Sequence, residues 1–500
     1  MPEARADRHD LVIRGGTVFD GTGGPGAVGD VAVSGDRVTA VGRVAGRGAV
    51  EIDASGAAVA PGFIDVHSHD DFAVLMTPDM PFKLMQGVTT TVVGNCGSGV
   101  VPYRAALARF GRLTPGAAPP EWDGFAGYMA RVDEAQPSLN VATLMGHGSL
   151  RAGAMGMEQR KPTGDEMAQM RRWVREGVEA GAVGLSTGLI YEPGRYAALD
   201  EIVALAREMG RDGGLYATHM RNEAAGLCDA VAEAIRVGEE GGVPVQISHH
   251  KAGGRENWGR VRDSLRLIEE ARARGADVTA DQYPYTAGST SFHAVVQNGA
   301  FRTDSPGGIG TLGPDQVLIA SAPKHPEYEG LRLADLVARW ALPVDEAAAR
   351  LLREEGEACF VVVFSMDEAD VRTVMAHPTT MIGSDGVPAA GSKPHPRLYG
   401  CFPRVLGHYV REGVLDLPTA IHRMTGMAAA KFRLADRGAI RAGAFADLVV
   451  FDPATIRDTA TYDDPRRFPE GIRAVYVNGM AVAREGRHTG ARPGRALRRA

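Results

Sequence analysis

Short apolar runs alternate with longer amphipathic stretches through most of the chain, between about residues 62 and 430. We interpret eight such runs as β-strands, at 63–66, 89–93, 141–144, 183–185, 215–217, 245–247, 278–280 and 380–382. Several of the segments between them carry apolar residues at helical spacing. Eight strand–helix units predict an α/β fold, a closed (β/α)8 barrel with its active site at the carboxyl ends of the strands. An open doubly wound sheet is the alternative, but no GxGxxG motif in a strand context supports it.

Two features interrupt or flank this repeat. The stretch between the seventh and eighth runs is too long for one crossover, so residues from about 287 to 350 are predicted to be an insertion over the barrel mouth. The sequence before the first run and near the end of the chain alternates apolar and polar residues, with glycine at the turns. Neither block has enough strands to bury a face alone. We expect 1–61 and 431–500 to form one small β-sandwich domain beside a barrel domain spanning 62–430.

Composition limits the classes of partner. The 500 residues contain 55 Lys plus Arg and 61 Asp plus Glu, a net charge of −6 without long charged runs, so neither nucleic acid nor an anionic membrane is expected. A small-molecule substrate fits better. The four cysteines are far apart and show no CxxC spacing, which disfavours a disulfide framework. Because the start, MPEARADRHD, has no apolar leader and no run is long enough to span a membrane, we expect a cytoplasmic protein.

Side chains that bind metals follow the predicted strands. The first run is followed by HSH, and residues two apart on an extended chain point to the same side, so His67 and His69 face one point. The other such residues are Cys96 after the second strand, His219 after the fifth, His249 and His250 after the sixth, and Asp385 after the eighth. Singly, a cysteine is usually a buried apolar residue, a histidine a satisfied polar one, and Asp before Gly a turn former. Together at one rim, they predict a metal centre.

These motifs resemble those of a known family. The HxH after strand one, the histidines after strands five and six and the aspartate after strand eight are similar to the amidohydrolase superfamily of metal-dependent hydrolases. HSHDD, GNCG, ATHMRNE, ISHHK, DQYPYTAG and GSDG together resemble the N-acyl-D-amino-acid deacylases, or D-aminoacylases, over nearly the whole chain. The resemblance implies a barrel, zinc, and hydrolysis of N-acyl-D-amino acids to a carboxylate and a free D-amino acid. The preference for D over L substrates comes from the resemblance alone.

The bridging ligand departs from many binuclear relatives, which use a carbamylated lysine after strand four. Strand four here has no lysine, and Cys96 fills the vacancy as a thiolate that can bridge two zinc ions. The resemblance implies a tight site made of Cys96, His219 and His249, and a second, weaker site made of His67, His69 and Asp385 with Cys96 shared. The sequence leaves open whether the second site is filled. His249 is preferred to His250 because it directly follows Ser248, as in the family motif.

A zinc ion would lower the pKa of water to about 7 and polarise the amide carbonyl. Asp385 is expected to act as general base toward that water and then as general acid toward the leaving nitrogen. The substrate's α-carboxylate needs cationic and hydroxyl donors. The candidates close in sequence to the ligands are Arg221, Lys251, Tyr283, Tyr285 and Ser289. The resemblance implies that Lys251, Tyr283 and Ser289 lie near the substrate, together with Tyr191. Arg221 could equally orient a loop through a salt bridge.

Other functions stay open. A D-specific dipeptidase or a cyclic-amide hydrolase on the same scaffold would share every ligand. A non-enzymatic binding scaffold is disfavoured, because such a protein has no physical need for six ligand positions. A mononuclear deaminase is disfavoured as well, because it has no evident use for Cys96. The sequence does not indicate the oligomeric state or the preferred substrate side chain.

Overall fold

The computed structural model describes residues 8–110, 118–297, 300–301, 308–388 and 392–499. Its central sheet has eight strands, β6 (Phe63–Asp65), β7 (Val88–Val93), β8 (Asn140–Gly146), β9 (Gly184–Gly188), β10 (Leu215–His219), β11 (Val245–Ile247), β12 (Val278–Gln282) and β18 (Thr380–Ile382). All neighbours pair in parallel and in chain order. The predicted (β/α)8 barrel is therefore confirmed. The start of the chain, where no leader is expected, and parts of the predicted insertion lie outside these residues.

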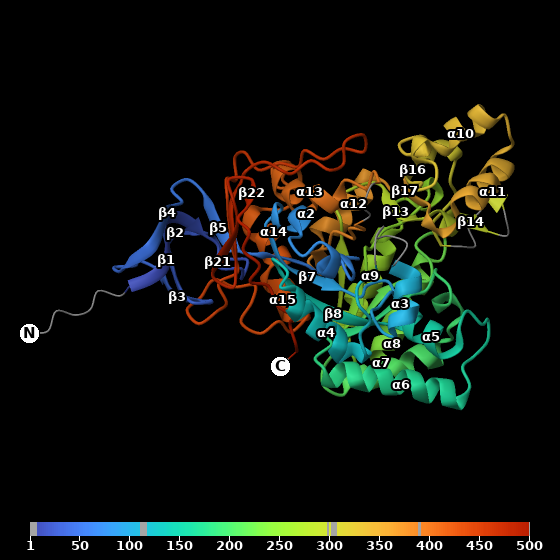
Figure 1. Ribbon diagram of the computed structural model, residues 1–500, viewed down its shortest axis with the longest axis horizontal. Helices are drawn as coiled ribbons and strands as arrows, with labels where there is room; N and C mark the ends of the chain where they lie inside the picture. Colours follow the sequence, from blue (N-terminus) through green and yellow to red (C-terminus); the bar gives the residue numbers. More distant parts are fainter. Residues whose placement is uncertain (1–7, 111–117, 298–299, 302–307, 389–391, 500) are drawn as a thin grey trace, which may run out of the picture.

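Helices surround the barrel (Figure 1). They are α1 (Ala73–Met76), α2 (Pro81–Leu84), α3 (Tyr103–Phe110), α4 (Gly124–Ala135), α5 (His147–Met155), α6 (Gly164–Glu179), α7 (Leu199–Gly210), α8 (Leu227–Gly241), α9 (Val261–Ala273), α12 (Glu368–Ala376), α13 (Arg397–Arg404), α14 (Leu417–Met424) and α15 (Gly426–Lys431). Helix α6 begins at a capping box, in which Thr163 and Glu166 each bond the other's backbone N–H. In the described part of the chain, no helix is both long and apolar enough to cross a membrane.

Strands from both ends of the chain form one nine-stranded sheet beside the barrel. It contains β1 (Arg8–Val18), β2 (Ala27–Ser34), β3 (Arg37–Gly42), β4 (Arg47–Asp53), β5 (Ala58–Pro61), β19 (Leu448–Phe451), β20 (Ile472–Val477), β21 (Met480–Arg484) and β22 (Arg487–His488). The two terminal blocks join where β5 pairs antiparallel with β19, with Val59 opposite Val450. Both valines belong to the sheet's own buried core. The small β domain built from both termini is thus part of the observed fold.

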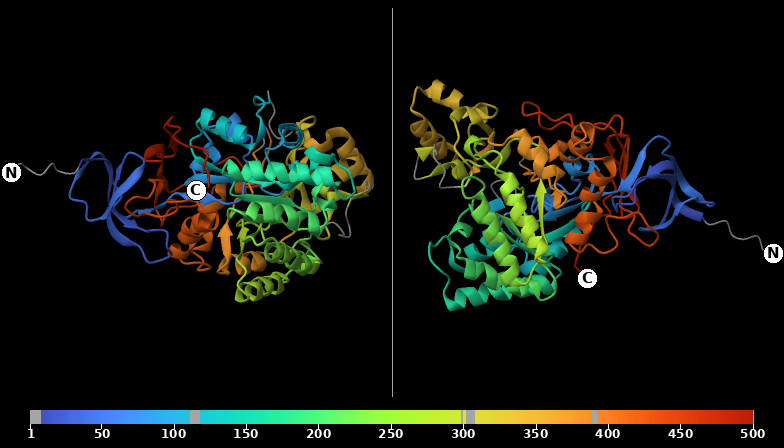
Figure 2. Two further views of the ribbon diagram at one scale, coloured as in Figure 1. Left: turned by 90° about the horizontal axis from the view of Figure 1, so that it is seen from below. Right: turned by 180° about the vertical axis from the view of Figure 1, so that it is seen from behind.

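An inserted subdomain lies between β12 and β18. It contains β13 (Gly288–Ser291), β14 (Val296–Gln297), β15 (Ala300–Phe301), β16 (Val317–Ser321), β17 (Phe360–Val363), α10 (Leu333–Trp340) and α11 (Val344–Glu355). Strand β17 is the middle strand of the sheet β13-β17-β16, so the subdomain continues past residue 350. Phe292, Ile319 and Leu351 belong to its separate apolar core. Figures 1 and 2 show that its helices lie at the opposite end of the molecule from β1–β4.

The first barrel strand packs against the terminal sheet through Phe63. This side chain has no exposed surface. Its ring stacks on Phe402 with centroids 5.8 Å apart, and the centroid of Phe451, in β19, lies 6.2 Å away. The aromatic cluster therefore ties strand β6, which precedes the HSH motif, to the β domain.

Replacement of Phe63 tests this tie. We expect Phe63→Ala to lower the free energy of unfolding by about 3–5 kcal/mol, because it leaves a cavity beside the rings of Phe402 and Phe451. Urea unfolding followed by circular dichroism measures the change. Val28→Ala, at a site with 78% exposed surface, is the control and should change the stability by less than about 0.5 kcal/mol. Equal shifts for the two variants would contradict the proposed packing role.

Candidate metal centre

The six predicted ligands lie just past the carboxyl ends of barrel strands. His67 and His69 follow β6, Cys96 follows β7, His219 ends β10, His249 follows β11, and Asp385 follows β18. All are buried except His69, which is partly exposed. Because parallel strands end at one rim of the barrel, residues far apart in sequence meet there.

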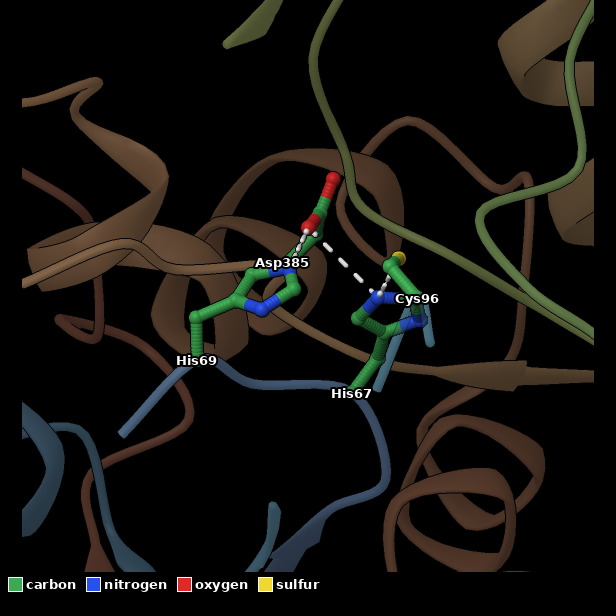
Figure 3. A group of neighbouring side chains, drawn as sticks. All are labelled: His67, His69, Cys96 and Asp385. Atoms are coloured by element: carbon green, nitrogen blue, oxygen red, sulfur yellow. Dashed lines mark hydrogen bonds and ion pairs between the residues drawn. The ribbon is translucent and has the colours of Figure 1, made fainter. Parts of the chain in front are cut away.

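The side chains form two groups that share one sulfur atom. The ligand atoms of His67, His69, Cys96 and Asp385 all lie within 4.8 Å of one another, as do those of Cys96, His219 and His249. Cys96 Sγ is 3.3 Å from His67 Nε2 and 3.5 Å from His249 Nε2. Asp385 Oδ1 is 3.1 Å from His69 Nε2 and 3.5 Å from His67 Nε2. Figure 3 shows these four side chains of the first group pointing toward one another.

Three of these residues have left-handed backbone conformations. Cys96 has a φ of 53°, His249 of 36° and Asp385 of 49°. Such angles are uncommon for residues other than glycine, and they concentrate at functional sites where the surrounding structure enforces them. The backbone turns sharply at each position just past a strand, and the turn aims the side chain across the barrel mouth.

The donor set fits zinc. Thiolate and imidazole are preferred zinc ligands, and a tetrahedral site with bonds of ~2.3 Å to sulfur and ~2.0 Å to nitrogen places the two donors about 3.5 Å apart. The measured Sγ–Nε2 distances are 3.3 and 3.5 Å. Among the described residues, neither ring nitrogen of the buried His219 makes a hydrogen bond. Burial favours the neutral Cys96 thiol, but His67 and His249 outweigh it and hold its pKa well below the usual range.

The end of β9, the fourth strand of the barrel, leaves no room for a side chain at Gly188. A Cβ on Gly188, the last residue of β9, would collide with the carbonyl oxygen of Cys96. Gly97, with a φ of 69°, packs equally closely against the same strand end. The loop that follows β7 and carries Cys96 therefore occupies the space beside β9. The sequence predicts a bridging thiolate from this loop in place of a lysine from β9.

Two carboxylates that the sequence did not single out orient the histidines. Asp281 Oδ1 lies 3.1 Å from His67 Nδ1 and also accepts the backbone N–H of His249. Glu223 Oε1 lies 2.9 Å from His249 Nδ1 and 2.6 Å from Lys251 Nζ. At His67 the carboxylate on the outer ring nitrogen fixes the tautomer and leaves Nε2 for a metal, whereas Nδ1 of His249 has the Lys251 ammonium 2.8 Å away as well as Glu223. Both acids lie in quoted motifs, DQYPYTAG and ATHMRNE, but no spacing rule distinguishes them from turn residues.

Arg397 holds the second oxygen of the predicted catalytic aspartate. Its Nη2 lies 2.9 Å from Asp385 Oδ2, and only 1% of the arginine surface is exposed. Burial raises the pKa of Asp385, but Arg397 and His67 outweigh it and hold that pKa well below its usual range. One carboxylate oxygen is thus fixed by the guanidinium, while the other faces the histidines.

The metal-binding groups open into a cavity of about 650 Å³. Four of the predicted substrate-binding residues line it, namely Tyr191, Lys251, Tyr283 and Ser289. The phenol of Tyr191 lies 3.2 Å from Thr290 Oγ1, so the loop after β9 meets the insertion. Residues of the insertion, including Val296 and Phe360, form an apolar part of the wall.

Arg221 makes the salt bridge that the sequence left open as its alternative role. Its guanidinium donates to both carboxylate oxygens of Glu233 and to the backbone carbonyls of Arg195 and Ala197. It is not among the residues that line the cavity. Strand β10 ends at His219, so the alternation that would place Arg221 beside the histidine stops there. Arg221 orients the loop through a salt bridge, and we do not assign it to the substrate.

The side chains of His249 and His250 point to different parts of the structure, because the backbone turns through a left-handed conformation at His249. His249 Nε2 faces Cys96. His250 is fully buried, and its Nε2 lies 2.8 Å from Ser264 Oγ on helix α9, away from both metal-binding groups. The geometry therefore favours His249 as the ligand.

We expect His249→Ala to lose tightly bound zinc and His250→Ala to retain it. The first variant removes a donor beside Cys96, whereas the second removes only a hydrogen bond to Ser264. Zinc content after dialysis, measured by atomic emission, distinguishes the two, and circular dichroism checks that both variants fold. Loss of zinc from the His250 variant alone would reverse the assignment.

Comparisons with known proteins agree with this arrangement. Residues 50–483 match the amidohydrolase family. A D-aminoacylase of Alcaligenes xylosoxydans xylosoxydans is 42% identical over 100% of this chain and 99% of its own length, and an N-acyl-D-glutamate deacylase of the same organism is 41% identical over 99% of this chain and 97% of its own. A crystal structure of N-acyl-D-glutamate deacylase from Bordetella bronchiseptica, complexed with zinc and a phosphonate mimic of the tetrahedral intermediate, has a TM-score of 0.89 at 40% identity, covering 98% of this chain and 100% of that chain. The barrel, its rim of metal-binding side chains and these matches show that the chain belongs to the amidohydrolase family.

Proposed function

We propose that this chain hydrolyses the amide bond of N-acyl-D-amino acids with the help of zinc, releasing a carboxylate and a free D-amino acid. The observation that carries the proposal is the sharing of Cys96 Sγ by two groups of metal-binding side chains that open into one cavity. Two relatives that match nearly the whole chain are a D-aminoacylase and an N-acyl-D-glutamate deacylase, and a similar solved structure holds zinc with a mimic of the tetrahedral intermediate.

Cys96, His219 and His249 would hold the tightly bound zinc. His67, His69 and Asp385, with the shared thiolate, would hold a second and weaker ion. When bound, zinc lowers the pKa of water to about 7 and polarises a carbonyl oxygen. The side chains around it would orient the substrate and move the proton.

Asp385 is the group that we assign to proton transfer. Arg397 fixes its Oδ2, so Oδ1 is the oxygen that faces the histidines and the cavity. In this position Oδ1 takes the proton of the attacking water and later gives it to the leaving nitrogen, which would otherwise depart as a poorly stabilised amide anion. General acid–base help of this kind typically accelerates a reaction by ~10²–10⁴-fold.

The substrate's α-carboxylate would bind near Lys251, Tyr283 and Ser289, beside Tyr191. Only 12% of the Lys251 side chain is exposed, and its Nζ lies 5.8 Å above the centre of the Tyr283 ring. Glu223 holds the ammonium 2.6 Å away, so the cation is fixed at the cavity wall beside His249. A carboxylate bound there would position the acyl amide over the metal-binding groups.

The proposal also covers the division of the chain and its location. We assign 1–61 with 431–500 to one β domain, 62–430 to the barrel, and the segment from about 287, which runs past the predicted end at 350 through β17, to an insertion that forms part of the cavity wall. We place the protein in the cytoplasm, because all four cysteines are free and the reducing compartment preserves the Cys96 thiolate as a ligand.

A substrate panel tests the proposed reaction. A cyclic-amide hydrolase or a D-specific dipeptidase would share every ligand, so only the products separate these activities. We expect zinc-dependent release of free D-amino acids from N-acetyl-D-amino acids, measured by an amine-reactive assay beside the L-enantiomers, hydantoins and dipeptides. Cleavage confined to hydantoins, to dipeptides or to the L-enantiomers would overturn the proposal.

We expect Asp385→Asn to lose ~10²–10⁴-fold in kcat, the usual contribution of a positioned acid–base group. The amide is nearly isosteric but cannot accept the water proton. The tight zinc should remain, because Cys96, His219 and His249 are unchanged. Steady-state kinetics and zinc analysis on the same sample measure both effects. A variant with near-normal kcat and bound zinc would remove Asp385 from the mechanism.

A further inference from the structure

The barrel has a seam between its first and last strands. In the sheet order, β6 and β18 are the two ends, and no run of paired residues joins them among the described residues. The contact consists of the isolated bridge between Ser68 and Gly386, together with backbone bonds from Asp385 N to His67 O at 2.7 Å and from His69 N to Gly386 O at 3.0 Å. Three of the predicted ligands, His67, His69 and Asp385, therefore lie on the two loops that meet at this seam.

A buried ionic cluster lies directly behind the seam. Asp65, the last residue of β6, accepts the backbone N–H of His67 at 3.2 Å and that of Ser384 at 2.8 Å. Ser384 Oγ donates to the same carboxylate at 2.6 Å. Lys83, on the short helix α2, donates to Asp65 and, at 2.8 Å, to Ser384 Oγ, and its Nζ lies 3.3 Å from Asp70 Oδ2. One carboxylate thus binds both loops, and one ammonium holds that carboxylate.

All four side chains of this cluster, Asp65, Asp70, Lys83 and Ser384, are completely buried. Burial lowers the pKa of Lys83, but Asp65 and Asp70 outweigh it and raise the pKa above its ordinary value, so the side chain is a cation. A buried charge pair contributes little net stability compared with apolar residues of similar volume, but it specifies one arrangement of its partners. None of these four residues is among those that line the cavity, so the cluster acts on the cavity through the loops that it holds.

We propose that Lys83 is a positioning residue for the group of metal-binding side chains at the seam, namely His67, His69 and Asp385. By holding Asp65 and Ser384 together, it sets the separation of His67 and His69 from Asp385, and with it the affinity of that group for a metal ion. The Cys96, His219 and His249 group lies on β7, β10 and β11, which belong to continuous paired strands, and does not depend on Lys83. The inference rests on the proposed metal ligands, but not on which amide is cleaved.

The test uses the full-length protein and Zn²⁺ alone as the probe. Lys83→Met removes the ammonium at similar length, and Lys83→Arg keeps a cation. The double variant Lys83→Met with Asp70→Asn removes one positive and one negative charge together, so the net charge of the cluster is unchanged. Lys431→Met is the matched control, because Lys431 is another buried lysine, paired with Asp277 at 2.8 Å just before β12, at the far ends of the strands.

Calorimetric titration of metal-free protein separates the two ions. We expect two binding steps in the wild type, an unchanged first step in every variant, and a second step weakened ~10–100-fold in Lys83→Met and in the charge-matched double variant, the usual effect of losing a group that orients ligands. Lys83→Arg should restore part of this affinity, and Lys431→Met should bind as the wild type does. In Lys83→Met, where Asp385 would be displaced, kcat should fall, while KM for an N-acetyl-D-amino acid should change little.

Several outcomes would overturn the proposal. A wild type that binds one ion only, a second step that is unchanged in both Lys83→Met variants, or equal weakening of both steps would each contradict it. Unfolding of the charge-matched variant by circular dichroism would also count against it, because the cluster would then support the whole barrel and not the seam loops. Absence of any hydrolytic activity in a wild type with normal binding steps would overturn the proposed reaction and leave this inference standing.

Discussion

One sulfur atom connects the two halves of the metal centre. Cys96 Sγ lies at similar distances from His67 Nε2 and His249 Nε2, on strands that are separated around the barrel. The sulfur reaches this position because the loop after β7 turns through left-handed conformations at Gly94, Cys96 and Gly97 and packs on the end of β9. A strained turn of this kind persists only where a rigid frame enforces it. The barrel is that frame, and the thiolate is the point on which both ligand groups depend.

The electrostatics of the site are consistent with a divalent cation. Around the imidazoles lie three carboxyl groups and a thiol, from Asp281, Glu223, Asp385 and Cys96, against two cations, Lys251 and Arg397. Buried acidic groups are costly unless they are paired or bind a metal. Lys251 balances Glu223, and Arg397 balances Asp385. The remaining acidic groups are Asp281, on the outer nitrogen of His67, and the Cys96 thiol, which faces the inner nitrogens of His67 and His249. A zinc ion beside the thiol would add positive charge there.

The sequence could predict what local spacing determines. Short apolar runs identified all eight barrel strands, and ligands that directly follow a strand could be read from their position, as His67 and His219 show. Contacts between residues that are far apart in the sequence could not be predicted. Lys83 meets Ser384 across 301 residues, and no periodicity links α2 to the loop after β18. Arg221 shows the limit of closeness in sequence, because two residues past His219 its guanidinium pairs with Glu233 and does not line the cavity.

The metal-binding side chains and part of the cavity wall belong to different parts of the fold. The ligands stand on strand ends whose positions the barrel fixes, whereas part of the cavity wall comes from an insertion with its own apolar core. Substitutions in that wall, at residues such as Val296 or Phe360, can change which side chain fits without moving a ligand. Relatives with different substrate names are indeed similar to this chain to nearly the same degree. The insertion shares this wall with residues of the loop after β9, such as Ile190 and Tyr196.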